Sequence, residues 1–160
     1  MRLKLSCVGR MKAGSESEIF DRFMDRARKS GRRFGLSRIE IVELLESRLT
    51  RRQDRKREEA AGLLSAMAKD ARLVALDERG TSMTSVDFSR RLFSWVDEGV
   101  SETVFAIGGP DGHGDEVLQR AHLRLALGQM TWPHQFVRMM VAEQIYRAIT
   151  IRAGHPYHRD

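Results

Sequence analysis

Two glycine-bearing loops are the stretches of this chain best suited to chemistry. The first is Ile107-Gly108-Gly109-Pro110-Asp111-Gly112, which ends the apolar run of residues 104–107. The second begins at Gly128 and reaches Pro133, after the apolar residues 125–127. Glycine lets a backbone approach a ligand closely because it has no Cβ, and Pro110 fixes φ, so we expect a tight, preformed first loop. Ligands bind at such strand ends in open α/β sheets, so the two loops predict a cofactor pocket.

The hydrophobic pattern predicts the strands and helices that position these loops. Apolar runs indicate strands at residues 3–8, 39–45, 72–77, 104–107 and 125–127. Helical spacing indicates helices from a capping box at residues 15–18 to Gly31, through residues 63–67, and over 85–99, 115–122 and 134–153. This alternation predicts an α/β fold, a mostly parallel sheet with helices on both faces. With 160 residues, the chain is expected to form one domain, residues 1–160.

The expected last helix is apolar over a wide arc. Its apolar residues cover more than one face, so the helix should be buried on more than one side. Either the rest of the fold or a second copy of the chain would cover it. These residues are Phe136, Met139, Met140, Val141, Ile145, Ala148 and Ile149.

The charge of the chain points to a polyanionic partner, with nucleic acid as the first candidate. The formal net charge is +6 and the isoelectric point is near 10.1. Residues 48–57 are the most basic segment, which is either a solvated helix face or mobile loop, or a phosphate-contacting patch. No aromatic residue interleaves its cations, so base stacking is not indicated there. The cations are Arg48, Arg51, Arg52, Arg55, Lys56 and Arg57.

Signatures of several other chemistries are missing from the sequence. It contains no GxxxxGK[ST], no GxGxxG after the first strand, no HExxH and no GxSxG. The single cysteine, Cys7, is expected to be a small core residue on a strand, and we expect no metal site, since His155 and His158 alone are close in sequence. No apolar run approaches the roughly 20 residues of a membrane span. The start has no signal-peptide core, so a cytoplasmic location is expected.

Four motifs together resemble one family closely. They are the glycine loop at 107–112, Pro133-His134-Gln135-Phe136-Val137-Arg138, Ala142-Glu143-Gln144-Ile145-Tyr146-Arg147-Ala148 and the terminal His155-Pro156-Tyr157-His158-Arg159. The chain resembles the ribosomal large-subunit RNA pseudouridine N3-methyltransferases, which are SPOUT (α/β-knot) enzymes. The resemblance covers the whole chain. Asp111 stands where that family often has glutamate.

The resemblance implies a C-terminal trefoil knot, a homodimer and S-adenosylmethionine held by the knot loops. A knot is not something that the sequence pattern itself would predict, because knots are nearly absent from proteins in general. Backbone groups would bind the adenine edge, and an apolar side chain would form a wall of the pocket. Carried over by position, the cofactor contacts are Leu76, Gly108, Gly109, Gly128, Gln129, Met130, Thr131, Trp132 and Pro133.

The implied reaction is methyl transfer from a sulfonium to a ring nitrogen. The positive charge of the donor already activates it, so the enzyme must align the reactants and remove the N3 proton. A base is needed, or a cation that stabilises the deprotonated ring, and the terminal residues are expected to complete the partner subunit's pocket. The candidates are His134, Glu143, Arg147, Tyr157, His158 and Arg159. Purely structural roles stay open for some of these: His134 as a helix cap, Glu143 and Arg147 as a helix salt bridge, and Tyr157 as a packing residue.

The expected substrate is large-subunit rRNA in the assembled ribosome, because the chain has no separate RNA-binding domain. Two alternatives stay open. One is a SPOUT methyltransferase that acts on transfer RNA or another rRNA site. The other is a basic, dimeric, ribosome-associated RNA-binding protein without enzymatic activity, which would bind no S-adenosylmethionine.

Overall fold

Five strands form one sheet in which every neighbouring pair is parallel. The computed structural model describes residues 1–159. The strands are β1 (Arg2–Val8), β2 (Arg38–Leu44), β3 (Arg72–Ser82), β4 (Glu102–Ile107) and β5 (Leu123–Ala126), in the order β2-β1-β4-β3-β5. The helices are α1 (Ser15–Gly31), the 3-10 turn η1 (Arg32–Phe34), α2 (Arg52–Ser65), α3 (Ser85–Asp97), α4 (Asp115–Arg120) and α5 (His134–Arg152). The predicted α/β class and parallel sheet are confirmed.

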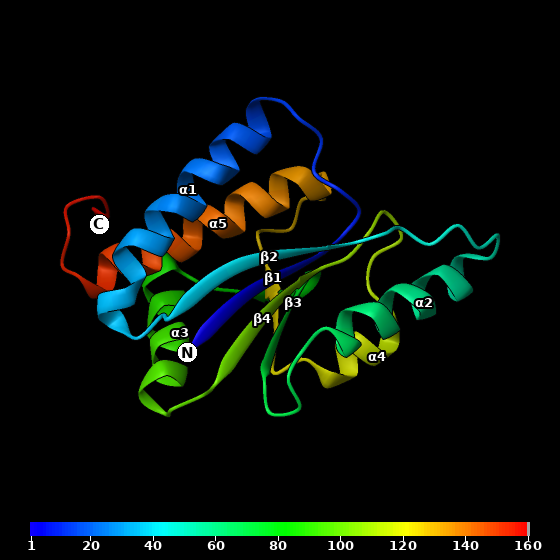
Figure 1. Cartoon of the computed structure of the whole chain (residues 1–160). Coiled ribbons are helices and arrows are strands. Elements are labelled where there is room, and N and C mark those ends of the chain that lie inside the picture. The colour runs from blue at the N-terminus through cyan, green and yellow to red at the C-terminus, as the bar shows by residue number, and fades with distance from the viewer. Residues whose placement is uncertain (160) are drawn as a thin grey trace.

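Helices cover both faces of the sheet, as predicted. Helices α1, α3 and α5 lie over one face, and α2 and α4 lie over the other (Figure 1). Strand β4 divides its side chains between the two cores: Phe105 and Ile107 join the first, and Val104 and Ala106 join the second. This alternation follows from the two-residue period of a strand. Both cores are apolar, which is why the strands read as continuous hydrophobic runs.

The predicted role of Cys7 is confirmed. The thiol is fully buried on β1, and burial raises its pKa to about 12. A thiol with so high a pKa is protonated at neutral pH and therefore a poor nucleophile. Cys7 is therefore a core residue of β1.

The start of α1 differs from the predicted capping box. Residue Gly14 occupies the N-cap, and its backbone N–H donates to the Ser17 hydroxyl at 3.1 Å. The hydroxyl of Ser15 instead donates to the carboxylate of Glu16. The prediction was wrong by one residue, because glycine also accepts the N-cap position and the sequence offered two serines in the same turn.

Strand β3 is longer than predicted, and its extension lies beside the candidate site. We expected it to end near Asp77, before Gly80, but it continues to Ser82. Its pairing with β5 shifts register between Leu76 and Thr81. A Cβ at Gly80 would lie 2.6 Å from the backbone of Arg124, so only glycine fits this irregular crossing.

Helix α5 packs between α1 and α3 against the sheet (Figure 1). Its buried residues include Val141, Ala142, Ile145, Ala148 and Ile149, so burial by the rest of the fold is confirmed. The aromatic ring of Phe136 remains 37% exposed. Within residues 1–159, no helix combines the length and apolarity that a membrane crossing needs.

Candidate functional site

Two loops leave the sheet at one edge, after the ends of β4 and β5, which lie on either side of β3. In the ladder, Ala75 lies opposite Ala106, and Leu76 lies opposite Leu125. Neighbouring strands are about 4.8 Å apart, so the loops after β4 and β5 begin on either side of Leu76 in β3. The structure therefore brings together the predicted cofactor residues at Leu76, at the glycine loop and at the loop that starts with Gly128.

The glycine loop, residues 108–112 after the end of β4, is tightly folded, as predicted. The backbone N–H of Gly112 donates to the carbonyl of Gly109 at 3.0 Å, and Gly112 has a φ of +77°. A Cβ at Gly108 would lie 3.1 Å from Gly112, and one at Gly109 would lie 3.0 Å from Val8. These two glycines are therefore needed for close approach to the protein's own atoms, whereas the sequence argument gave a ligand as the reason.

The second loop, residues 128–133, is open. Residue Gly128 has a φ of +103°, and a Cβ there would meet nothing within 4 Å. The hydroxyl of Thr131 donates to Glu78 at 2.8 Å, and the indole N–H of Trp132 donates to the carbonyl of Leu127 at 3.2 Å. Within the described residues, no hydrogen bond uses the backbone N–H of Gln129, Met130 or Thr131. Exposed backbone donors with no internal partner are the groups that would bind a nucleobase edge.

Histidine 113 lies beneath the glycine loop, and the sequence argument gave it no role. It is 6% exposed, and its Nδ1 would be 3.3 Å from a Cβ at Gly108. Burial lowers its pKa, although the charge of Asp77 and the carbonyls of Ala106 and Leu76 oppose this. The imidazole is therefore neutral at pH 7 and forms a polar floor for the loop.

Three of the predicted catalytic residues form one cluster, to which α5 contributes Glu143 and Arg147 and the tail after it contributes Tyr157. The guanidinium of Arg147 donates to Glu143 Oε1 at 2.6 and 2.9 Å, and the Tyr157 hydroxyl donates to the same oxygen at 3.0 Å. Tyr157 also packs against Tyr146, with ring centroids 4.9 Å apart. Burial and the bond to Glu143 raise the pKa of Tyr157, so its phenol stays protonated. The helix salt bridge between Glu143 and Arg147, considered above as a structural role, is present. Because Glu143 also accepts a hydrogen bond from Tyr157, this pair holds the C-terminal tail in place.

Of the other catalytic candidates, His134 lies apart from this cluster, and His158 and Arg159 directly follow Tyr157 in the tail. His134 is the first residue of α5, nine residues before Glu143 and so about 13.5 Å away along the helix. Burial, followed by the positive charge of Arg138, lowers the pKa of His134, so the ring is neutral at pH 7. His158 is half-buried and Arg159 is exposed. The single chain thus does not join His134 to the cluster of Glu143, Arg147 and Tyr157.

A mainly apolar cavity of about 640 Å³ lies between α1, α5 and the start of α3. Residue Gly128 of the second loop and Glu143 of the α5 cluster both line it. Most of its other walls are apolar, including Phe23, Met139 and Met140. The cavity therefore joins one cofactor candidate and one catalytic candidate across an apolar surface.

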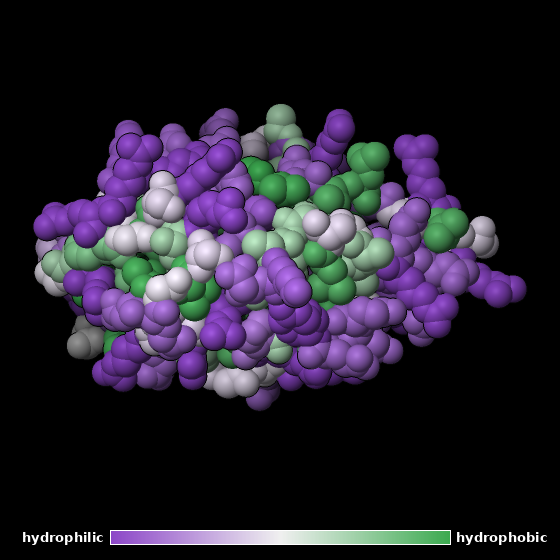
Figure 2. All heavy atoms as spheres, turned by 60° about the horizontal axis from the view of Figure 1, so that its bottom comes forward, coloured by the Kyte–Doolittle hydropathy of each residue, from purple (hydrophilic) through white to green (hydrophobic). Residues whose placement is uncertain are grey.

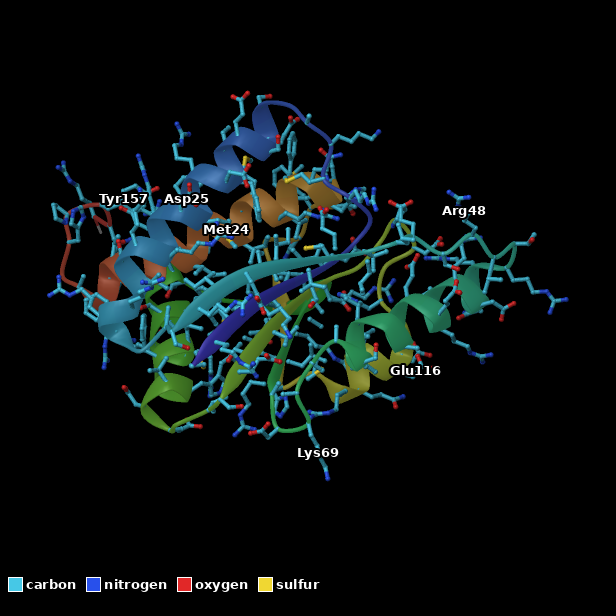
Figure 3. All side chains as sticks on the ribbon, viewed as in Figure 1. Met24, Asp25, Arg48, Lys69, Glu116 and Tyr157 are labelled. Carbon is cyan, nitrogen blue, oxygen red and sulfur yellow. The ribbon has the colours of Figure 1, made fainter. Side chains whose placement is uncertain are left out.

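The basic segment, residues 48–57, divides into two sets of arginines. The side chain of Arg55 donates to Asp111 of the glycine loop at 2.7 Å, and Arg52 lies 3.3 Å from the same carboxylate. The hydrogen bond from Arg55 holds the pKa of Asp111 below its usual value. The remaining arginines of the segment, Arg48, Arg51 and Arg57, are exposed. Figure 3 shows Arg48 at one end of the molecule and Tyr157 at the other.

One buried cation was missed by the sequence analysis. The side chain of Arg138 is fully buried and donates to Glu43 at 2.8 Å and to the carbonyls of Val8 and Gly9 at 2.7 and 2.9 Å. The available signal was position, because Arg138 precedes the buried Val141 and Ala142 at helical spacing. A charge on a buried stripe requires partners.

Across residues 1–159, no group of three or more His, Cys, Asp or Glu side chains is placed to hold a metal ion.

Comparison with known proteins gives consistent matches. The family model described as "Predicted SPOUT methyltransferase" matches residues 1–158. The ribosomal RNA large subunit methyltransferase H of Xanthobacter autotrophicus is 50% identical over 159 residues, 99% of each chain. The protein of that name from Methylocella silvestris is 50% identical over 160 residues, 100% of each chain. A solved structure of a probable methylase family protein from Haemophilus influenzae Rd KW20 has a TM-score of 0.50 at 11% identity, over 99% of this chain and 70% of that one, which is a likeness of fold alone.

Proposed function

The chain belongs to the SPOUT methyltransferase family, and from this premise we propose that it methylates N3 of a pseudouridine in large-subunit rRNA. The observation that carries the proposal is full-length similarity, at 50% identity, to proteins named ribosomal RNA large subunit methyltransferase H. We propose that the whole chain acts as one α/β-knot domain, that the assembled ribosome is the substrate, and that the protein works in the cytoplasm.

The cofactor that we propose is S-adenosylmethionine. The residues fit it, because the second loop offers backbone donors at Gln129, Met130 and Thr131 that the protein leaves without internal partners. The side chain of Leu76 is half-buried within β3, where the register with β5 shifts, and offers an apolar wall. The glycine loop and Pro133 would close the site from either side. When bound, the cofactor supplies a methyl group already activated by a positively charged sulfur.

The protein itself must remove the N3 proton, and we propose that His134 accepts it. A proton acceptor must be unprotonated at the working pH, and burial favours the unprotonated form of this imidazole by lowering its pKa. The phenol of Tyr157 is protonated, and its single O–H, which bonds to Glu143 in the free chain, would turn to the ring oxygen on which negative charge develops. In the free chain, Glu143 and Arg147 hold the Tyr157 ring in place, and the exposed guanidinium of Arg159 adds positive charge.

These roles require a second copy of the chain. Within one chain, Tyr157 bonds to Glu143, about 13.5 Å along α5 from His134. A homodimer in which the tail of one subunit reaches the loops of the other would bring these groups together. Apolar side chains around the cavity, with Phe136 at 37% exposure, suit such an interface. On the face in Figure 2, by contrast, apolar residues show only in patches among hydrophilic ones.

We also propose that the C-terminal part is knotted, as the family implies. The second loop contacts the β3 extension through Thr131 and Glu78 before the chain continues as α5 between α1 and α3. That path is compatible with threading past residues 77–82. If the backbone of an experimental structure straightens fully when its two termini are pulled apart, the chain contains no knot and this proposal is refuted.

The deciding experiment is transfer of labelled methyl from S-adenosylmethionine to intact ribosomes, isolated subunits, naked rRNA and transfer RNA. We expect label on one pseudouridine, and only in assembled ribosomes. Label on transfer RNA or naked rRNA would change the proposed substrate, while the proposed methyltransferase activity would stand. If no substrate is labelled and a titration shows no cofactor binding, the non-enzymatic RNA-binding alternative replaces the proposal.

Deletion of residues 155–160 tests the role of the tail. We expect the shortened protein to lose methyl transfer while it still binds cofactor and forms dimers, because Leu76 and both loops lie outside the deletion. Mixing it with full-length protein that carries His134→Ala should restore part of the activity, since one pocket of the heterodimer is then intact. Wild-type turnover by the shortened protein would remove the tail from the mechanism.

A further inference from the structure

The glycine loop and the residues after it, as far as Gly114, lie directly on α2. A Cβ at Gly109 would be 3.2 Å from the carboxylate of Glu59, and one at Gly114 would be 2.8 Å from the carbonyl of Lys56 and 2.9 Å from Ala60. A side chain at position 114 would collide with the backbone of α2, and one at position 109 would displace the carboxylate of Glu59. The position of the loop therefore depends on α2.

Arginine 55 of α2 joins the loop to the basic segment. Its Nε donates to Asp111 at 2.7 Å, and its Nη1 donates to the carbonyls of Leu49 and Thr50 at 3.0 and 2.9 Å. The side chain is 28% exposed, against 67% for Arg52. One guanidinium thus fixes two loops from different parts of the chain, which suits the planar fork of arginine.

We propose that the basic segment has two functions: Arg55 is a positioning residue for the cofactor loop, and the exposed Arg48, Arg51 and Arg57 are the cations that face nucleic acid. No ion pair within the described residues uses these three side chains. Phosphate groups can therefore bind them without breaking the link between Arg55 and Asp111. The inference rests on the proposed cofactor site and adds that a residue outside the cofactor loops determines its affinity.

The test compares Arg55→Ala with Arg57→Ala, which removes the same charge from the same helix. In a calorimetric titration with S-adenosylmethionine, Arg55→Ala should raise the Kd at least about fivefold, the lower end of typical coupling between sites. Arg57→Ala should stay within about twofold. In a titration with poly(U), Arg57→Ala should lower the salt slope of binding by about one. Arg55→Ala should change that slope less.

A double-mutant cycle separates positioning from a general loss of stability. Asp111→Ala should raise the Kd for cofactor as Arg55→Ala does, and the double variant should add little further. On ribosomes, Arg55→Ala should raise the KM for cofactor and leave kcat near that of the wild type. Equal cofactor affinity in Arg55→Ala and Arg57→Ala, or additive effects of Arg55→Ala and Asp111→Ala, would overturn the inference. Wild-type protein without cofactor affinity would instead overturn the proposed function.

Discussion

Replacing Arg138 by alanine should destabilise the protein more than removing any surface cation. Its side chain is fully buried and donates three hydrogen bonds, to Glu43, Val8 and Gly9. These bonds fasten α5 to the ends of β1 and β2. Alanine would leave two backbone carbonyls and a carboxylate without their donor, and would also leave a cavity.

The size of the effect follows from how well water can replace the lost partner. Breaking a buried ion pair from one side costs about 3–5 kcal/mol. The side chain of Glu43 is 30% exposed and also accepts a hydrogen bond from the backbone of Met11. It can therefore be rehydrated, which places the cost near the lower end, at about 3 kcal/mol. For a chain of this size, that lowers Tm by about 6–12 °C.

Thermal unfolding followed by circular dichroism, at one fixed protein concentration, measures this change. The control is Arg152→Ala on the same helix, whose ion pair with Asp97 at 3.2 Å joins side chains 47% and 58% exposed. That variant should lose less than about 3 °C. If Arg138→Ala melts within about 2 °C of the wild type, or no lower than Arg152→Ala, the buried clamp does not contribute as argued.

Three further predictions concern the site. Tyr157→Phe keeps the ring contacts but loses the hydrogen bond to Glu143, so methyl transfer should fall about tenfold or more with cofactor affinity unchanged; equal rates would leave Tyr157 a packing residue. Because burial lowers the pKa of His134 below 6.5, the transfer rate should be level above that pH and decline on acidification, and the decline should vanish in the residual activity of His134→Gln. Gly128→Ala and Gly99→Ala each place alanine at positive φ, at +103° and +76°, and should each cost about 1–2 kcal/mol of stability. Only Gly128→Ala should weaken cofactor binding in a titration, and equal weakening by both would indicate a global effect.

Local patterns were sufficient to predict the elements of the fold. Short apolar runs bounded by turn residues predicted all five strands, and Gly31 and Gly99 lie where α1 and α3 end or just beyond. Errors occurred at element ends. Strand β3 continues past Gly80 because β5 pairs with it across a register shift. Pairing with a strand far away in the chain cannot be predicted from a short stretch of sequence.

The site was predicted less completely. Resemblance to a family placed Glu143, Arg147 and Tyr157 among the functional residues, and the structure joins them through one carboxylate oxygen. The function of Arg55 could not be inferred, because its partner Asp111 is 56 residues away in sequence. In the sequence, Arg55 is one of several similar cations.

The sequence by itself determined the α/β class, the two glycine-bearing loops and the family, because periodicity and short motifs are local properties of a chain. Only the tertiary structure decided which charges meet. In the folded protein, Arg138 is buried against three acceptors and Arg55 bonds to Asp111 of the glycine loop. Arg57 is exposed to solvent, and His134 lies apart from Tyr157. The physical reason is that burial and ion pairing depend on distances between segments far apart in sequence, and these distances are set by the packing of the sheet and its helices.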